Sequence, residues 1–299
     1  MEQNLLSLIG QVNLRRIKDM SPLECGLYVV ATPIGNLGDI TLRGIEVLML
    51  ADKIACEDTR VTRKLLFRHS IKSKVTSYHD HNANTVRPVL IQEIKNGGTV
   101  ALVCDAGMPS ISDPGYKLIR DSIVAGLYVT VVPGASAGLS GLVLSGLPTD
   151  RFLFLGYLPS KSQQRRNTLE EVSGISASLI FHENPERLVR SLKDMLCVLG
   201  DRPVAVLREL TKLHEEVRRG SLNELWAHYA HSAKPKGEIV VVVGPANDIE
   251  KISDKEIFTI LGERLKVLSV RDAVFEVAAI TKQARKKIYM MAIKLQTPS

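Results

Sequence analysis

Short apolar runs alternate with helix-like segments along most of this chain, from residue 27 to residue 243. Parallel strands need long crossover connections, usually helices, so this alternation predicts an α/β fold with mainly parallel sheets. The expected strands are 27–31, 53–56, 74–78, 99–104 and 128–132 in the first half, and 152–157, 177–182, 203–208 and 238–243 in the second.

The pattern resets around Leu147-Pro148-Thr149, which predicts a domain boundary near residue 148. A polar stretch at 244–254 is typical of a linker. The segment after it shows only helical periodicity, which predicts a small helix-turn-helix-like module. In chain order, the predicted units are an N-terminal extension over 1–24, an α/β domain over 25–148, a second α/β domain over 149–245 and the helical module over 252–296.

Composition excludes several classes of protein. Apolar residues make up 45% of the chain, which supplies a large core and disfavours disorder. The four cysteines are scattered and form no CxxC pair, so we expect a reduced cytosolic protein without disulfides or a metal site. The N-terminus lacks the basic region of a secretory signal, and no apolar run reaches the roughly 20 residues of a membrane-spanning helix. The net charge of +7 favours a polyanionic partner without proving one.

The common nucleotide-binding fingerprints are missing from the sequence. It contains no GxxxxGK[ST] motif, and the first expected strand leads into TPIGNLG, with proline where a dinucleotide-binding motif has its first glycine. The sequence therefore gives no support for binding of ATP, GTP or NAD.

Small or ionisable residues follow four of the expected strands. These loops contain TPIGN, EDTR, CDAGMPSISDPG and VPGASAGLSG. Ligand sites of parallel sheets lie in the crevice at the carboxyl ends of the strands, and glycine or alanine lets a ligand approach the main chain closely. The loops together predict a cleft for a flat, uncharged or zwitterionic ligand held largely by backbone groups.

The loop at 104–115 also has a simpler interpretation. It could be a Pro/Gly-rich surface turn that leads into a helix. For the helix that follows the loop, the sequence predicts Asp113 as the N-cap, Pro114 as the first helical residue and Gly126 as the end.

Eight segments between residues 25 and 245 resemble, in their order, the tetrapyrrole-methylase superfamily: ATPIGNLGDITLR, ACEDTR, SYHDHN, VCDAGMPSISDPGY, VPGASA, GLPTDRFLFLGYLPSK, RELTKLHEE and GEIVVVV. Within it they resemble most closely the bacterial enzymes that 2′-O-methylate a cytidine in the decoding region of 16S ribosomal RNA. The resemblance implies S-adenosylmethionine as methyl donor, bound in a cleft between two α/β domains of a homodimer. It also implies the small ribosomal subunit as partner and no metal or membrane.

The resemblance assigns cofactor contacts to residues of both domains. They are Pro33, Asp105, Ala106, Gly107, Ser110, Ser136 and Ala137 from the first domain, with Glu183 and Leu210 from the second. The chain departs from the family at 182–187, where it reads HENPER and the family often has Tyr-Glu-Ser-Pro-His-Arg.

Methyl transfer to a hydroxyl oxygen needs in-line positioning and is helped by a general base. We consider Asp58, Glu57 and His79 as candidate bases, and Arg60 and Lys64 as phosphate contacts. The alternative for Asp58 is that it caps a helix that begins near Thr59 and pairs with Arg60.

Two basic clusters are candidates for RNA binding: Lys161, Arg165 and Arg166 in one, and Lys282, Arg285, Lys286 and Lys287 in the other. From charge alone, a solvated helix face explains the second cluster better than RNA binding does. Two other functions stay open: methylation of a small tetrapyrrole precursor, and a non-catalytic ribosome-binding factor. Binding of S-adenosylmethionine would separate the last from both enzymes.

Overall fold

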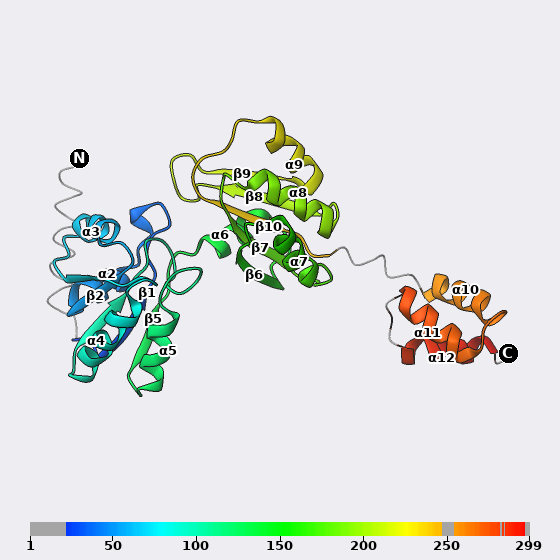
Figure 1. Ribbon diagram of the computed structural model, residues 1–299, viewed down its shortest axis with the longest axis horizontal. Coiled ribbons are helices and arrows are strands. Elements are labelled where there is room, and N and C mark those ends of the chain that lie inside the picture. The colour runs from blue at the N-terminus through cyan, green and yellow to red at the C-terminus, as the bar shows by residue number, and fades with distance from the viewer. Residues whose placement is uncertain (1–21, 247–253, 282, 284, 297–299) are drawn as a thin grey trace.

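The structure is a computed structural model that describes residues 22–246, 254–281, 283 and 285–296. It contains two five-stranded sheets, each covered by helices, and a separate set of three C-terminal helices (Figure 1). The two α/β domains and the helical module match the predicted architecture.

The first sheet is wholly parallel and has the order β3-β2-β4-β1-β5. Its strands are β1 (Gly26–Val30), β2 (Lys53–Cys56), β3 (Lys74–Ser77), β4 (Thr99–Leu102) and β5 (Val129–Val132). Its connections contain η1 (Leu37–Asp39), α2 (Leu42–Leu50), α3 (Thr59–Arg68), α4 (Ala83–Lys95) and α5 (Tyr116–Val124). Because β1 lies between β4 and β5, the carboxyl ends of these three strands are neighbours.

Both faces of this sheet are buried, which explains its unbroken apolar runs. In β1, Tyr28 and Val30 belong to the core formed with α2 and α3. Leu27 and Val29 belong to the opposite core, formed with α4 and α5. Because successive side chains of a strand point to opposite faces, the single segment GLYVV contributes residues to both cores.

The second sheet has the order β6-β7-β10-β8-β9 and is mixed. Its strands are β6 (Phe152–Tyr157), β7 (Ser178–Glu183), β8 (Pro203–Arg208), β9 (Glu216–Ser221) and β10 (Ile239–Val243). One face is covered by α7 (Ser162–Val172), α8 (Leu188–Leu199) and α9 (Leu222–His231). The expectation of mainly parallel strands is wrong for this sheet, since only β6 and β7 pair in parallel.

The unexpected antiparallel pairing follows from β9, which the apolar pattern did not reveal. Its sequence, EVRRGS, is largely charged because β9 is an edge strand that pairs only with β8. A capping box between Ser221 and Glu224 then starts α9 directly after the strand.

Helix α6 (Ala137–Ser145) connects the two sheets and covers the second face of the second sheet. Two of its glycines allow this close approach. A Cβ atom at Gly141 would lie 2.7 Å from Val240 Cγ1, and one at Gly138 would lie 3.2 Å from the Phe154 ring. By packing, α6 therefore belongs to the second sheet, although it precedes the boundary expected near residue 148.

The C-terminal helices α10 (Asp254–Leu265), α11 (Val270–Thr281) and α12 (Arg285–Gln296) share a core of their own. Ile257, Leu261, Val277 and Ile288 are fully buried in it. Within the described residues, no helix has the length and apolar character needed to cross a membrane.

Candidate active site

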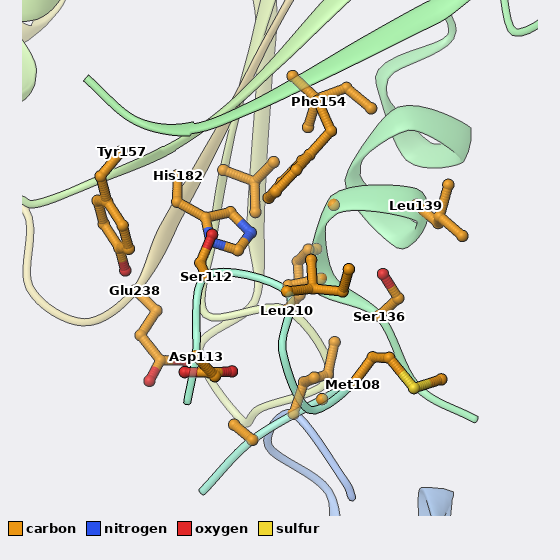
Figure 2. Close-up of a pocket in the computed structure, with 18 of the residues that line it drawn as sticks. Met108, Ser112, Asp113, Ser136, Leu139, Phe154, Tyr157, His182, Leu210 and Glu238 are labelled. Carbon is orange, nitrogen blue, oxygen red and sulfur yellow. The ribbon is translucent and has the colours of Figure 1, made fainter. Parts of the chain in front are cut away.

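A cavity of about 540 Å³ lies between the loops at the carboxyl ends of the first sheet and the α6-covered face of the second (Figure 2). This volume is in the usual range of small-molecule sites. The first domain contributes residues 105–108, 111–113 and 133–134, and α6 contributes residues from its first turn. The second domain contributes Phe152, Phe154, Tyr157, Ile180, His182, Leu210, Glu238, Ile239 and Val240.

One wall of the cavity is fixed by a backbone bridge between the loops after β1 and β4. The Thr32 and Gly107 amides each donate to the other residue's carbonyl, at 2.8 and 3.0 Å. The Thr32 hydroxyl also donates to the Cys104 carbonyl at 3.1 Å. Gly107 has φ +83°, a conformation that L side chains rarely adopt, which explains the glycine at this position.

The loop beyond this bridge is unusually contorted. Ser110 and Ser112 have φ values of +69° and +64°, and Gly115 has +142°. Each left-handed serine costs on the order of 1–3 kcal/mol, so the surrounding contacts must hold the loop in place. The prediction that Asp113 caps the next helix is wrong: α5 begins at Tyr116, after Gly115. The Asp113 side chain lines the cavity instead.

The opposite wall contains the His182 ring, which contacts the rings of Phe154 and Tyr157 edge to face. The His182 imidazole lies 5.1 Å from the Phe154 ring and 5.4 Å from the Tyr157 ring, between ring centroids. Its Nε2 atom is buried and has no hydrogen-bond partner among the described residues. Burial lowers the pKa of His182, which favours the neutral imidazole.

A loop of the second domain closes the cavity and touches the first domain. Glu209 and Thr211 have left-handed backbones, with φ +53° and +65°, and they hold the buried Leu210 against the cavity. The Thr211 hydroxyl accepts a hydrogen bond from the Asn36 amide at 3.1 Å. The Lys212 ammonium lies 3.1 Å from the Glu238 carboxylate. The loop therefore links the β1 turn to the start of β10.

A second, more polar cavity of about 370 Å³ adjoins the first. Its lining is Glu57, His79, Asp80, His81, Ser110, Ser112, Asp113 and Pro114. Ser112 and Asp113 line both cavities. The two spaces therefore meet at this short stretch of loop.

The carboxylates around this junction influence one another. Burial raises the pKa of Asp113, and the charge of Asp105 adds to the effect. Burial also raises the pKa of Glu57, with smaller contributions from the charges of Asp105 and Asp113. For Asp105, burial raises the pKa and a hydrogen bond from the Asp58 amide opposes it. Repulsion of this kind disfavours a phosphate in either cavity and favours a cation or a neutral hydrogen-bond donor.

Most of the predicted cofactor residues lie together in the first cavity. Its lining includes Asp105, Ala106, Gly107, Ser136, Ala137 and Leu210. Pro33 is buried next to Ile34 but does not line the cavity, and Ser110 lines the second cavity instead.

Glu183 is buried on the opposite face of β7, where its carboxylate lies 3.3 Å from the Arg187 guanidinium. Adjacent strand residues point to opposite faces, so His182 takes the place in the cavity that the resemblance assigned to Glu183.

The three candidate bases separate into two groups. Glu57 and His79 line the second cavity. The Asp58 carboxylate instead accepts a 2.8 Å hydrogen bond from the Arg60 amide as the N-cap of α3, and it also pairs with the Arg60 guanidinium at 2.6 Å. These interactions lower the pKa of Asp58 to about 2. The helix-cap alternative is therefore confirmed.

The candidate RNA contacts differ in their accessibility. Arg165 is 3% exposed, pairs with Asp194 and donates to two backbone carbonyls, so a phosphate cannot reach it. Arg166 pairs with the same carboxylate and is partly exposed. Lys64 and Lys161 are exposed.

In the helical module, the Arg285 guanidinium lies over the Phe275 ring at 4.6 Å. Lys286 is exposed, and Lys287 pairs with Asp254 at 2.8 Å. Lys282 lies outside the described residues.

Several cavity residues were not predicted from the sequence, among them Ile34, Met108, Ser112, Phe154, Tyr157, Ile180 and Glu238. Strand alternation is the signal that could have identified part of this set, because Ile180 and His182 are two residues apart on one face of β7. Among the described residues there is no group of three or more His, Cys, Asp or Glu side chains that could hold a metal ion.

Comparison with known proteins gives the family. The sequence pattern of the family described as Tetrapyrrole (Corrin/Porphyrin) Methylases matches residues 26–226. A protein of Mesorhizobium japonicum named "Ribosomal RNA small subunit methyltransferase I" is 47% identical over 279 residues, which cover 93% of this chain and 95% of that protein. A protein of the same name from Halalkalibacterium halodurans is 50% identical, over 78% of this chain and 79% of that protein.

Solved structures agree on the fold. The crystal structure of diphthine synthase superposes with a TM-score of 0.57 at 17% identity, over 73% of this chain and 89% of that one. The crystal structure of the methyltransferase CobJ superposes with a TM-score of 0.55 at 16% identity, over 74% and 94%. The family match and the sequence relatives show that the chain belongs to the tetrapyrrole methylase family and is a methyltransferase.

Proposed function

We propose that this protein transfers a methyl group from S-adenosylmethionine to the 2′-hydroxyl of a cytidine in the decoding region of 16S ribosomal RNA. The observation that carries the proposal is the 47% identity, over nearly the full length of both chains, to a protein named for methylation of small-subunit ribosomal RNA. The pair of adjoining cavities supports it further, since a donor and an acceptor must meet for the methyl group to pass.

The first cavity has the chemistry that S-adenosylmethionine requires. Figure 2 draws Tyr157, Glu238 and Asp113 toward one side of this cavity, and Met108 and Leu139 toward the other. Apolar side chains suit an adenine ring, and the carboxylates of Asp105 and Glu238 suit a sulfonium and an ammonium group. The buried Nε2 of His182 offers a further hydrogen-bonding atom that the protein itself leaves unpaired.

When bound, S-adenosylmethionine supplies a methyl group on a positively charged sulfur. The residues of this chain have three tasks around it. The Thr32–Gly107 bridge holds the loop after β4 in place. Leu210 and the aromatic residues of the second domain exclude water. The residues of the second cavity orient the acceptor hydroxyl, with Glu57 and His79 as candidates for contact with the ribose or its base.

The RNA backbone would lie outside the two cavities, where the exposed cations are. Arg60 and Lys64 of α3 follow directly after the Glu57 end of β2. Lys161, Arg166, Arg285, Lys286 and Lys287 provide further positive charge on the second domain and the helical module. Phosphate contacts of this kind give affinity without sequence preference.

We also propose that the protein acts as a homodimer. On α6, Leu139, Val143 and Leu144 are exposed although the other side of the helix packs on the second sheet. Exposed apolar groups of this kind favour an interface. Light scattering coupled to size-exclusion chromatography would give the mass of a dimer if the proposal is right, and that of a 32.9 kDa monomer if it is wrong.

Transfer of labelled methyl from S-adenosylmethionine would test the proposed function. Assembled small subunits, free 16S RNA and tetrapyrrole precursors would serve as parallel acceptors. We expect label in the RNA, at one ribose that then resists alkaline hydrolysis. Label in a tetrapyrrole alone would contradict the proposed substrate but agree with the family. If no acceptor is labelled and the protein does not bind S-adenosylmethionine, a ribosome-binding factor is favoured instead.

A further inference from the structure

Asp113 is placed differently from the other acidic residues of the site. Among the described residues, it is the one ionisable side chain that lines both cavities. Asp105 and Glu238 line only the first cavity, while Glu57 and Asp80 line only the second. A group that passes from one cavity to the other must therefore pass beside the Asp113 carboxylate.

The chain holds Asp113 at this junction by contacts with both domains. Ser112, directly before Asp113, has a left-handed backbone and lies against the second domain. There, a Cβ atom on Gly156 would lie only 3.1 Å from the Ser112 hydroxyl, so the glycine at the β6 bulge leaves room for the loop. Pro114 and Gly115 then lead into α5. These features keep Asp113 out of a helix cap, which its sequence context otherwise favours.

We propose that Asp113 is the general base of the methyl transfer, the group that takes the proton from the acceptor hydroxyl. This inference rests on the proposed function, because it assumes a hydroxyl acceptor in the second cavity and a sulfonium donor in the first. The hydroxyl oxygen forms a bond to the methyl carbon while the carbon–sulfur bond breaks. The electron pair of that bond stays on sulfur, which becomes a neutral thioether, and the hydroxyl proton ends on Asp113.

The other candidates are less suited to this step. Asp58 caps α3 and pairs with Arg60, and its pKa of about 2 makes it a weak base. Glu57 and His79 lie in the second cavity but do not border the first. Asp113 has a raised pKa because it is buried, which makes its carboxylate a stronger base than an exposed aspartate.

Several titratable groups face the same space and must be considered in any pH profile. They are Cys104 and Asp105 on the same loop, Glu57 after β2, His79, Asp80 and His81 after β3, and Tyr157, His182 and Glu238 from the second domain. Substitution of one carboxylate at a time is therefore needed to assign a titration to Asp113.

The test compares Asp113→Asn, Asp113→Glu and Glu57→Gln in the full-length protein. Single-turnover methyl transfer to small ribosomal subunits gives the rate, and calorimetry gives the affinity for S-adenosylmethionine. We expect Asp113→Asn to lose about 10²-fold or more in rate, the usual contribution of a general base, with donor affinity within about threefold of wild type. Asp113→Glu should recover part of the rate, and Glu57→Gln should lose less than about tenfold.

Two pH measurements distinguish a base from a merely structural residue. The wild-type rate should fall as the pH decreases through the raised pKa of Asp113, and Asp113→Asn should lose this acidic limb. Carboxyl ¹³C NMR, which needs no turnover, should show the raised pKa values of Asp105 and Asp113 in wild type, and the Asp113 signal should be missing from Asp113→Asn.

A rate for Asp113→Asn within about threefold of wild type would overturn the inference, as would an acidic limb that survives in this variant. A parallel loss of donor affinity would assign Asp113 to binding and overturn it too. If wild-type protein labels no ribosomal RNA, the proposed function fails and this inference with it. If wild-type protein labels the RNA but the Asp113 variants do not behave as expected, only this inference fails and the proposed function stands.

Discussion

At the scale of single residues, Asp58 interacts closely with its sequence neighbour Arg60. Asp58 accepts from the Arg60 amide and pairs with the Arg60 guanidinium, and the resulting pKa of about 2 is below the ordinary value of 3.8. A carboxylate with a lowered pKa stabilises the folded state above the ordinary value, and this stabilisation is lost as the pH falls toward the lowered pKa.

Asp58→Asn should therefore be less stable than wild type at neutral pH, and the difference should shrink as the pH falls from about 4 to about 2. Asparagine can still cap α3, so the variant isolates the charge from the cap. Urea denaturation across this pH range would measure the difference, in which the titration of carboxylates that do not interact with Asp58 cancels. A difference that stays constant with pH would show that the Asp58 charge does not act on stability.

At the scale of secondary-structure elements, a buried ion pair joins two helices of the second domain. Arg165 of α7 pairs with Asp194 of α8, and their side chains are 3% and 4% exposed. The sequence alone favoured RNA contact for Arg165, because a basic cluster does not show which of its members points inward. The amphipathic period of α7 is weak, with Leu169 and Val172 as its other buried residues.

Arg165→Ala should destabilise the protein by about 1–3 kcal/mol, since it removes one of the two guanidinium partners of the buried Asp194 carboxylate, while Arg166 and Ser162 still contact it. Lys161→Ala, one residue before α7 and exposed, is the matched control and should leave the unfolding free energy nearly unchanged. Chemical denaturation measures both variants. Equal stability of the two would contradict the structural role of Arg165.

Helix α6 allows a similar comparison between two glycines. Gly141→Ala places a methyl group 2.7 Å from Val240 Cγ1, so it should destabilise the protein by about 1–3 kcal/mol. Because α6 forms part of the first cavity, the variant should also bind S-adenosylmethionine more weakly. Gly262→Ala in α10 meets no atom within 4 Å and should stabilise its helix by about 0.5–1 kcal/mol. Thermal unfolding measures the stability of both variants, and calorimetry measures their affinity for S-adenosylmethionine. If Gly141→Ala has wild-type stability and affinity, α6 can move away from the sheet without cost.

At the scale of the whole molecule, the two α/β domains were predictable because apolar strands buried on two faces produce a strong local pattern. Strand β9 was missed because its charged residues lie at an edge, where burial does not select apolar side chains. The sequence predicted the cavity mainly through its first-domain loops, and Leu210 was the predicted second-domain residue that lines it. His182 and Glu238 lie on or next to β7 and β10, which pair antiparallel with Ile239 opposite Glu183. This pairing joins segments far apart in the sequence, so no local pattern predicts it. The position of Asp113 depends on the left-handed Ser112, which sequence propensity disfavours.

The distribution of charge over the whole molecule leads to a last prediction. The cavities are lined by carboxylates, while exposed cations lie on α3, before α7 and on α12. RNA binding should therefore depend on salt through residues outside the cavities. For a single strand, the slope of log K against log salt should decrease by about 0.7 for each phosphate contact removed. Lys161→Ala combined with Lys286→Ala should reduce the slope by about twice this amount if each lysine contacts one phosphate.

Lys95→Ala, at the end of α4 and away from the carboxyl ends of the strands, removes the same charge and is the control. Filter binding to a single-stranded RNA at several salt concentrations would measure all three slopes. Since Asp113→Asn changes a carboxylate inside the cavities, it should leave the slope as in wild type while it lowers the rate of transfer by about 10²-fold or more. A slope reduced equally by Lys95→Ala would mean that overall net charge attracts the RNA, and that these two lysines have no special role.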